Sequence, residues 1–458
     1  MQTANTELQT VADYLAAAPG RELPENVRER AKLHILDTVA AIVSGSRLAG
    51  GVRGRAWAAA YGQLQGGTPA TIVGSNQPGS AFVAALCNGM SAHADETDDS
   101  HPESLSHPGC AVVPAALAAA ETAGASGELL LRSVTAGYDI GCRVGRTVGL
   151  LRHDVRIGSR SSHSMVGGFG AVAAAAVAFG FNEQQVRHAI SYGSQLSSGI
   201  TTWMRDTHHV EKAFVFAGMP ASQGLLATTL VRSGCDGVED VFSGRPNWLE
   251  AVAKQPEPEW MVWELGREYE ITRTTLKKYS VGSPAQAAVE AMLELVREAG
   301  LRAEEVLKIE IRLPADSYFI VDSREMPSIN CQYLVVGTLQ DSRFSFEMAH
   351  DEARMTRPDV RDLLGRTTLI PDEGIRGTRG AHLAVTRRVD GGEEVLNRTV
   401  THVRGTAALP MSVAEVTEKA LDLIAPVIGA EKGQALCDRI LDLESVGGVG
   451  ELMQLMNG

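Results

Sequence analysis

Up to about residue 268, small and apolar residues recur at helical spacing in one segment after another. In residues 26–43 the apolar positions fall on one face of a helix, and Ser44-Gly45-Ser46 ends it. Small side chains let helices approach one another closely, so we expect a compact helical bundle rather than a repeat solenoid. Further Ala- and Gly-rich helices are predicted at residues 81–94, 111–123, 127–148, 167–180, 183–197 and 219–233.

The pattern changes near residue 270. Residues 306–313 (VLKIEIRL) alternate apolar and polar side chains, which is typical of a half-buried strand. Two more runs of this kind, residues 381–389 and 395–403, flank Asp390-Gly391-Gly392, a strong hairpin signal. Residues 283–299 and 352–364 are predicted to be helical. This middle section is therefore predicted to be α+β.

From Ser412 onward the chain is predicted to be helical again, with Ser412 and Glu415 forming a capping box. The fold class that follows is mainly α, with an α+β insertion. We expect a helical domain built from residues 1–268 and 407–458, interrupted by a smaller α+β domain over residues 269–406. A cleft between two such domains is a common place for an active site.

Composition narrows the function classes. The 458 residues are 44% hydrophobic and 21% charged, which is typical of a soluble globular protein and excludes a disordered or fibrous one. The formal net charge is −13 without a long basic run, so nucleic acid is not an expected partner. The amino terminus has no basic stretch followed by an apolar core, and the most apolar segment, residues 169–181, is too short for a membrane span.

The six cysteines lie far apart, without the close spacings of metal or redox sites. We therefore expect reduced thiols, a cytoplasmic protein, and neither a membrane partner nor an iron–sulfur cluster. Neither a Walker-type phosphate loop nor a strand followed by GxGxxG occurs, so a nucleotide cofactor lacks support. The absence of GxSxG disfavours an esterase.

The densest polar cluster runs from His93 to His107 and holds five acids and three histidines between two Ala-rich helices. It has three interpretations. It could be a solvated acidic loop ending in a Pro-Gly turn, or a site for a hard cation, although its spacing fits no EF-hand loop. It could also carry acid–base chemistry, because histidine exchanges protons near neutral pH and carboxylates orient it.

Three further polar segments have both structural and functional interpretations. Residues 156–163 (RIGSRSSH) precede a small-residue helix and could form a simple helix cap or a carboxylate pocket. Residues 205–212 hold adjacent histidines without an HExxH pattern, which argues against a zinc site. Residues 273–284 read as a basic linker, unless Lys278 faces the cleft and binds an anionic substrate.

These segments, in this order, resemble the MmgE/PrpD family, which includes 2-methylcitrate dehydratase, cis-aconitate decarboxylase and iminodisuccinate epimerase. The resemblance implies a helical domain built from both termini, an inserted lid domain, a homodimer, and catalysis without a metal ion or organic cofactor. It runs along nearly the whole chain, through residues 31–46, 93–114, 137–145, 167–180, 212–224, 278–285 and 330–333.

The resemblance also implies residue roles. The family's His-x-x-Asp-x-Asp-Asp-Thr pattern matches His93 to Ser100, with Glu96 standing where an aspartate is usual. The family's His-Pro-Gly matches His107-Pro108-Gly109. The main departure follows Lys278, where many relatives carry a histidine and this chain has SVGSPAQ instead. The family's second catalytic histidine, its lysine before a Gly-Ala turn and its lid tyrosine correspond to His163, Lys212 and Tyr333.

From these implied roles we expect a cofactor-independent lyase that removes a proton next to a carboxylate of a small di- or tricarboxylate. Dehydration of a 2-methylcitrate-like substrate is the first hypothesis. Decarboxylation or epimerisation of a related polycarboxylate (cis-aconitate or iminodisuccinate type) is the alternative, and a non-catalytic metabolite-binding relative is the rival from another class. The expected roles are proton transfer by His107 and His163, orientation by Glu96 or Asp98, carboxylate binding by Lys212, Lys278 and Arg205, a hydrogen bond from Tyr333, and substrate binding by Ser100 and Ser283.

Overall fold

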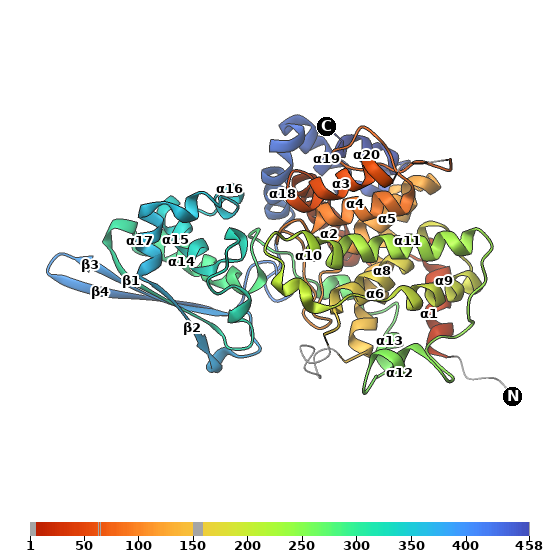
Figure 1. Cartoon of the computed structure of the whole chain (residues 1–458), viewed down its shortest axis with the longest axis horizontal. Coiled ribbons are helices and arrows are strands. Elements are labelled where there is room, and N and C mark those ends of the chain that lie inside the picture. Colours follow the sequence, from red (N-terminus) through yellow and green to blue (C-terminus); the bar gives the residue numbers. More distant parts are fainter. Residues whose placement is uncertain (1–5, 63, 65, 150–158, 458) are drawn as a thin grey trace. The chain divides into compact units, whose positions relative to one another are not determined.

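The computed structural model describes residues 6–62, 64, 66–149 and 159–457 (Figure 1). Its backbone contacts divide the chain into two compact units. The helical unit comprises Met1–Ala94, Asp98–Leu276 and Ser412–Gly458. The α+β unit comprises Lys277–Met411 together with the short stretch Asp95–Thr97. The predicted fold class, mainly α with a smaller α+β part, is confirmed.

The helical unit takes its helices from both ends of the chain. The first part contributes α1 (Glu7–Ala17), α2 (Glu25–Gly45), α3 (Ala49–Tyr61), α4 (Ala81–Ala92), α5 (Gly109–Ala123), α6 (Gly127–Thr147), α8 (Ser162–Ala178), α9 (Glu183–Leu196), α10 (Val210–Ala213), α11 (Met219–Arg232), α12 (Trp248–Val252) and α13 (Glu259–Val262). The last part contributes α18 (Val413–Ile428), α19 (Ala430–Leu441) and α20 (Gly450–Met456).

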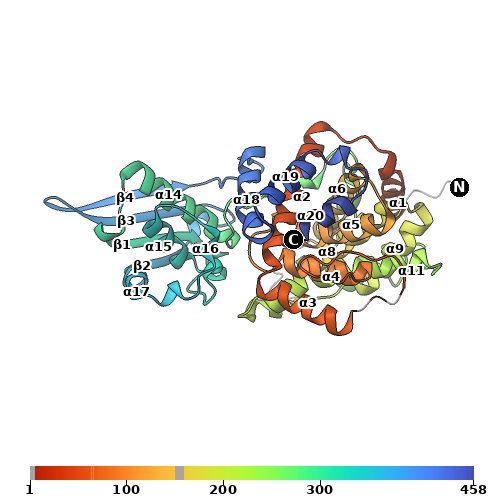
Figure 2. The same cartoon turned by 90° about the horizontal axis from the view of Figure 1, so that it is seen from above.

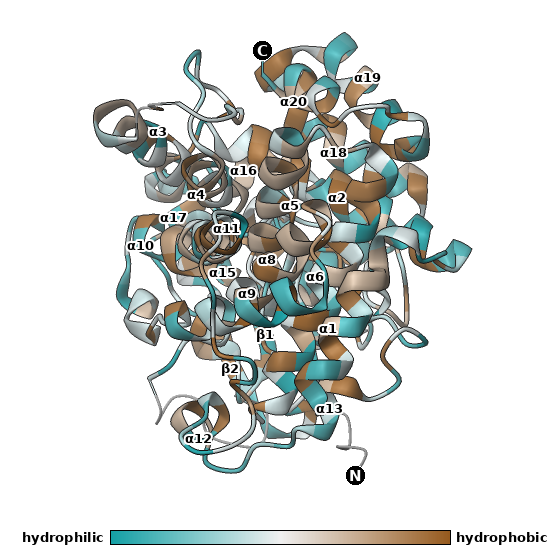
Figure 3. Cartoon of the chain, turned by 90° about the vertical axis from the view of Figure 1, so that its right-hand side faces the viewer, coloured by the Kyte–Doolittle hydropathy of each residue, from teal (hydrophilic) through white to brown (hydrophobic). Residues whose placement is uncertain are grey.

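Helix α8 is the centre of this unit, surrounded by α5, α6, α9 and α11 (Figure 3). Close approach between these helices depends on glycine. A Cβ atom on Gly224 of α11 would lie 2.4 Å from the Cβ of Ala171 in α8, and one on Gly141 of α6 would lie 2.6 Å from the carbonyl oxygen of Val166. The sequence expectation that small residues bring the helices together is confirmed.

The carboxyl-terminal helices complete the unit by packing on α2 (Figure 2). Lys419 of α18 donates from Nζ to Asp37 Oδ1 of α2 over 2.6 Å, and the two side chains are only 8% and 1% exposed. Burial raises the pKa of Asp37 to about 6, although Lys419 opposes the shift. The predicted capping box at the start of α18 is confirmed, because the side chains of Ser412 and Glu415 each accept from the other's backbone N–H.

Among the described residues, Val210–Arg232 is a helical run of sufficient length and hydropathy to cross a membrane. In this structure, however, 61% of its tested window is buried inside the protein. It includes the π-helical turn Phe214–Gly218 and α11, which packs on α4 and α8. The run therefore occupies the place of a core helix in the bundle.

The α+β unit is built around a four-stranded sheet of order β2-β1-β3-β4. Strands β1 and β2 are parallel, while β1–β3 and β3–β4 are antiparallel. Leu383 and Val385 of β3 join the buried core formed with α14 and α15. The strands are β1 (Val306–Pro314), β2 (Thr367–Asp372), β3 (Ala381–Val389) and β4 (Gly392–Val400), and the helices are α14 (Gln286–Ala299), α15 (Cys331–Asp341), α16 (Phe346–Ala349) and α17 (Pro358–Gly365).

Local chemistry explains where these elements depart from the sequence prediction. The helix predicted over residues 352–364 is interrupted, because the residue before Pro358 is disfavoured in helical conformation, and Arg357 is extended with ψ 142°. The hairpin is present, but β4 begins directly at Gly392 and ends at Val400. Strand β2 was not predicted, since TTLIPD lacks an alternating pattern and ends close to a proline.

Candidate active site

The loop between α4 and α5 carries the acidic and histidine-rich cluster of the helical unit. His93 caps the end of α4, and His107 precedes Pro108 at the start of α5. Asp98 is buried between them. The ring N–H of His93 donates from Nδ1 to Asp98 Oδ2 over 2.9 Å, and His107 Nδ1 lies 3.3 Å from the same oxygen. One carboxylate oxygen therefore contacts both imidazole rings.

The second predicted histidine joins this cluster from another helix. His163 lies in the first turn of α8, and its ring centroid is 5.2 Å from that of His107. Phe216, from the π-helical turn, stacks on His163 at 3.6 Å and on His93 at 4.4 Å. His107 is 12% exposed in its side chain, while His93 is fully buried. The structure thus brings Asp98, His107 and His163 together around one aromatic ring.

Burial controls the charge of two of these rings. Desolvation lowers the pKa of His93 to about 3, despite the opposing carboxylate of Asp98. Desolvation also holds the pKa of His163 well below its usual value, and the nearby His107, His93 and Lys212 lower it further. Within the described residues, His163 Nδ1 has no hydrogen-bond partner. A neutral imidazole with an unused ring nitrogen therefore lies beside His107.

Two of the predicted cations come from the segment before α11. Lys212 of α10 has its Nζ 5.1 Å from the Phe216 ring centroid and 5.5 Å from that of Trp203. Its backbone N–H donates to Asp206 Oδ2 over 2.9 Å, which fixes the start of this short helix. Arg205 ends a 3₁₀ turn and is exposed. Lys212 therefore lies beside the histidine cluster, whereas Arg205 lies in a solvent-exposed turn.

The segment predicted to form a carboxylate pocket, residues 156–163, is described only in part. Arg156, Ile157 and Gly158 lie outside the described residues. Arg160 donates to the carbonyl oxygen of Ala251 over 2.9 Å. In the described part of the segment, Ser162 and His163 begin α8 and Ser161 stands at the N-cap position, but its side chain makes no capping hydrogen bond, so the expected side-chain cap is not formed by Ser161.

Asp99, next to Asp98, holds the loop from its other side. Its Oδ1 accepts from the backbone N–H of Gly109 over 3.0 Å, at the start of α5. Its Oδ2 accepts from His34 Nδ1 over 2.7 Å and from the hydroxyl of Tyr138. A Cβ on Gly109 would lie 2.6 Å from the Tyr138 hydroxyl, so only glycine fits here. Asp99 therefore fixes the helix that directly follows His107.

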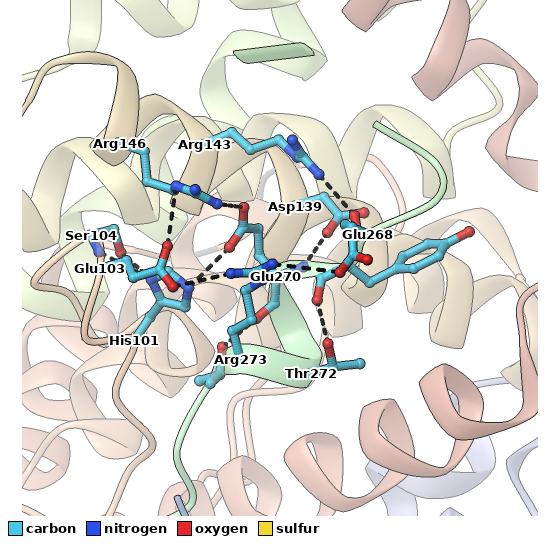
Figure 4. A network of polar contacts seen from close by, with 12 residues as sticks. His101, Glu103, Ser104, Asp139, Arg143, Arg146, Glu268, Glu270, Thr272 and Arg273 are labelled. Carbon is cyan, nitrogen blue, oxygen red and sulfur yellow. Dashed lines mark hydrogen bonds and ion pairs between the residues drawn. The ribbon is translucent and has the colours of Figure 1, made fainter. Parts of the chain in front are cut away.

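A second buried network holds the same loop near His101 (Figure 4). His101 Nε2 donates to Glu270 Oε2 over 3.1 Å, and Arg146 donates to Glu270 Oε1 over 2.6 Å. Arg146 and Arg273 also pair with Glu103, at 3.3 and 3.2 Å. These contacts connect the loop to α6 and to the 3₁₀ turn Glu270–Arg273.

Two carboxylates in this network have opposite pKa shifts. Burial opposes the shift of Glu270, but the hydrogen bond from His101 and the charges of Arg146 and Arg143 lower its pKa to about 2. Burial raises the pKa of Asp139 to about 6, against the charge of Arg143 and the hydrogen bond from Tyr14. Asp139 Oδ1 accepts the backbone N–H of Glu270 over 2.7 Å. Glu270 is therefore a stabilised buried anion.

The expected role of Tyr333 does not fit its position in the α+β unit. Tyr333 is fully buried in the core, and its hydroxyl donates to the carbonyl oxygen of Met348 over 2.7 Å, so it packs rather than offering a hydrogen bond to a substrate. Glu96 belongs to the same unit, where its carbonyl oxygen accepts from Lys277 Nζ over 2.9 Å. Its expected role in orienting a histidine stays a prediction.

The remaining predicted ligands have other contacts. Lys278 Nζ lies 3.2 Å from Glu290 Oε2 and is one-third exposed, while its neighbour Lys277 is buried beside Glu96. Ser100 pairs its backbone with Thr275 over 2.9 Å. Ser283 begins a 3₁₀ turn, and its buried Oγ has no hydrogen-bond partner among the described residues. Lys277, which the sequence analysis did not single out, is thus the buried lysine of the pair, and carboxylate binding by Lys278 stays a prediction.

Sequence reasoning also missed Phe216, which contacts three of the histidines, and His350. Phe216 stands in an apolar run, FVFAG, that reads as ordinary core. In the α+β unit, His350 Nε2 lies 2.8 Å from Asp95 Oδ2. Burial alone would raise the pKa of Asp95, but the contacts with His350 and Thr97 outweigh it and lower that pKa. The sequence signal that could have pointed to His350 is its partner Asp95, which belongs to the acidic cluster.

Within the described part of the helical unit, one group of side chains could in principle hold a metal ion. His93, Asp98 and Cys110 each offer a ligand atom, and these atoms lie within 4.8 Å of one another. However, the thiol of Cys110 donates to the carbonyl oxygen of His107 over 3.1 Å, while metal binding needs a thiolate. His93 Nδ1 is already engaged with Asp98. His93 Nε2, in contrast, has no hydrogen-bond partner among the described residues.

Comparisons with known proteins cover nearly the whole chain. A family model described as the MmgE/PrpD N-terminal domain matches residues 9–261, and one described as the MmgE/PrpD C-terminal domain matches residues 279–443. The cis-aconitate decarboxylase-like protein oryM of Aspergillus oryzae is 24% identical over 472 residues, spanning 95% of this chain and 94% of that protein. The cis-aconitate decarboxylase of Aspergillus terreus is 22% identical over 473 residues, spanning 95% and 93%.

Proposed function

The chain belongs to the MmgE/PrpD family, and from this premise we propose that it is a lyase acting on a small di- or tricarboxylate. The proposed reaction transfers a proton at a carbon next to a carboxylate. Such a C–H bond is a weak acid, so the reaction needs a base, a proton donor and a cation that stabilises the enolate-like charge. The observation that carries the proposal is that the rings of His107 and His163 lie side by side, with their centroids 5.2 Å apart.

His107 is the proposed base. The carboxylate of Asp98, 3.3 Å from Nδ1, favours the tautomer with a proton on Nδ1 and leaves Nε2 to accept a proton from carbon. The Asp98 carboxylate then stabilises the imidazolium that forms. The proposal expects the 3.3 Å separation of His107 Nδ1 and Asp98 Oδ2 to shorten when substrate binds, because catalytic hydrogen bonds often tighten in the substrate complex.

His163 is the proposed second proton carrier. Its lowered pKa keeps it neutral at pH 7, and the proton that His107 takes from carbon is proposed to pass to His163, whose protonated form is a strong acid. Such an acid can protonate a leaving hydroxyl group in a dehydration. Lys212, beside Phe216, is the proposed cation for a substrate carboxylate.

Dehydration of a 2-methylcitrate-like substrate is the first candidate, because a base and an acid on neighbouring rings supply both proton transfers of an elimination. Decarboxylation of cis-aconitate is the second candidate, and the printed names of the two Aspergillus relatives favour it. In a decarboxylation, loss of CO₂ places a negative charge on the carbon, and the reaction then needs only a proton donor to that carbon. Both candidates are proposed to proceed without a metal ion or organic cofactor.

The test is an NMR assay of EDTA-treated protein with 2-methylcitrate, citrate, cis-aconitate and iminodisuccinate in D₂O. The proposal expects an unsaturated product or CO₂, with solvent deuterium at the reacting carbon. His107→Asn is expected to abolish turnover, whereas His402→Asn, a change at an exposed histidine, is the matched control. Tight binding of a polycarboxylate without turnover or deuterium exchange would make the protein a non-catalytic binder.

We further propose a cytoplasmic homodimer. All six cysteines are free and five of them are buried, which suits a reducing compartment. On α3, the side chains of Trp57 and Tyr61 are 40% and 80% exposed, and aromatic residues are enriched at interfaces between subunits. Light scattering of the purified protein after size-exclusion chromatography tests the dimer. A mass of one chain at micromolar concentration contradicts it.

A further inference from the structure

A tight turn, His101–Ser106, lies immediately before His107. The backbone N–H of His101 donates to the carbonyl oxygen of Ser106 over 2.8 Å, and that of Ser106 returns a bond to His101 over 3.2 Å. Inside the turn, His101 Nδ1 accepts from the backbone N–H of Ser104 over 3.1 Å. Nδ1 is therefore unprotonated, and the proton on Nε2 is the one donated to Glu270.

The tip of this 101–106 turn is strained. Leu105 has φ +48°, in the left-handed region that non-glycine residues rarely adopt. Its carbonyl oxygen accepts from the hydroxyl of Ser162 over 2.5 Å. Ser162 directly precedes His163 in α8. The turn is therefore connected to both histidines. His107 follows it directly in the chain, and the hydrogen bond from Ser162 links it to the start of α8, next to His163.

The base of the 101–106 turn is anchored in the buried network of Figure 4. Glu270 binds His101 on one carboxylate oxygen and Arg146 on the other. Close approach of the turn to α6 requires Gly145, because a Cβ there would lie 2.6 Å from the Cβ of Ser104. A strained conformation persists only where surrounding contacts over-determine it. These contacts meet that condition.

We propose that the 101–106 turn sets the spacing of His107 and His163, and that Ser162 is the positioning residue that connects the turn to α8. This rests on the proposed function in taking the two rings as the proton-transfer pair. Misplacing a reacting group by about 1 Å can cost roughly 100-fold in rate, so a single bond at this point has a large effect on chemistry. The Ser162 hydroxyl donates to the backbone of the turn, so the proposal expects substrate affinity to stay unchanged when this bond is lost.

The experiment compares Ser162→Ala with Ser161→Ala in the full-length protein. Ser161 is the matched control, because it is also buried, and its Oγ has no hydrogen-bond partner within the described residues. Ser162→Ala is expected to lower kcat roughly tenfold or more with KM changed less than about twofold. Ser162→Thr, which keeps the hydroxyl, is expected to restore kcat, and Ser162→Cys, with a weaker donor, to give an intermediate value.

A second readout does not depend on turnover. In ¹³C-histidine NMR spectra, Ser162→Ala is expected to shift the ring resonances of both His107 and His163, assigned with single His→Asn variants. If wild type turns over no polycarboxylate, the proposed function fails, and these resonances still test the turn. The positioning role is overturned if Ser162→Ala matches Ser161→Ala in ring resonances, or in kcat where turnover is measured. If Ser162→Ala does not fold, Ser162→Cys provides the same comparison.

Discussion

Asp98 and Asp99 are adjacent in sequence, but their carboxylates bind separate groups. Asp98 Oδ2 contacts His93 and His107, whereas Asp99 accepts from His34, from Tyr138 and from the backbone at the start of α5. Asp98 therefore contacts the two histidine rings of the candidate site, whereas Asp99 holds the helices around that site together. This division allows stability and activity to be separated by mutation.

Asp98→Asn is expected to lower kcat by about 100-fold or more, because the amide cannot stabilise the imidazolium of His107. KM is expected to change little. Steady-state kinetics with whichever polycarboxylate the NMR assay shows to be turned over check this, and Asp438→Asn, at an exposed helical position, is the control. A kcat within threefold of wild type would contradict the role of Asp98.

Asp99→Asn is expected to destabilise the helical unit by about 3 kcal/mol, because an amide cannot accept from three buried donors and leaves a buried group unpaired. Urea unfolding followed by circular dichroism measures the change. Asp13→Asn, on the exposed face of α1, is the control. If the unfolding midpoint of Asp99→Asn equals that of the control, the scaffold role is wrong.

His163 is expected to remain neutral through the pH range around 6.5 in which an ordinary histidine titrates, because burial holds its pKa well below 6.5. The ¹³C resonance of its ring is then constant over this range. The measurement is an NMR titration with His163→Asn used for assignment. An exposed histidine such as His402 serves as the internal reference for a titrating ring. A His163 inflection between pH 6 and 7 would contradict the expected desolvation.

Glu270 is expected to make stability depend on acid pH. Its folded-state pKa, about 2, is below the ordinary value of 4.5, so its contribution is fully present above about pH 4.5 and is lost as pH falls toward 2. Between pH 5 and pH 3, wild type is expected to lose about 2 kcal/mol more unfolding free energy than Glu270→Gln. Urea unfolding at each pH measures this. Glu268→Gln, at a half-exposed carboxylate, should follow wild type.

Ser412→Ala is expected to cost about 1 kcal/mol of unfolding free energy, because the first turn of α18 loses its side-chain acceptor. Ser412→Asp, another good N-cap, should retain most of it. Equal urea midpoints for Ser412→Ala and wild type would show that this cap adds nothing to stability.

Periodic patterns made much of the fold predictable. Strand β3 has the bounds that its alternation indicates, and the capping box marks the start of α18. Strand β2 could not be predicted, because its pairing partner β1 lies more than 50 residues away, and its own residues carry little pattern. Helix α8 begins five residues before the prediction, since polar Ser162 and His163 enter its first turn.

The sequence predicted which segments form the candidate site, but not which side chains contact one another within it. The spacing of His93, Asp98 and His107 identified the loop, but not the fact that one oxygen of Asp98 contacts both rings. Lys277 and Lys278 cannot be told apart by sequence, because neighbouring side chains point in different directions and only the fold buries one of them. Phe216 could not be predicted as a site residue, because an apolar side chain in an apolar run looks like any other core residue in the sequence.

The pair Asp37–Lys419 has a consequence for biosynthesis. Asp37 and Lys419 are 382 residues apart, and the α+β unit Lys277–Met411 lies between them in the chain, so the buried carboxylate of Asp37 has no counter-charge until that unit has been translated. Nascent chains fold from the amino terminus onward. The helical unit that holds the histidine cluster can therefore be completed only after α18 has been translated and packs on α2.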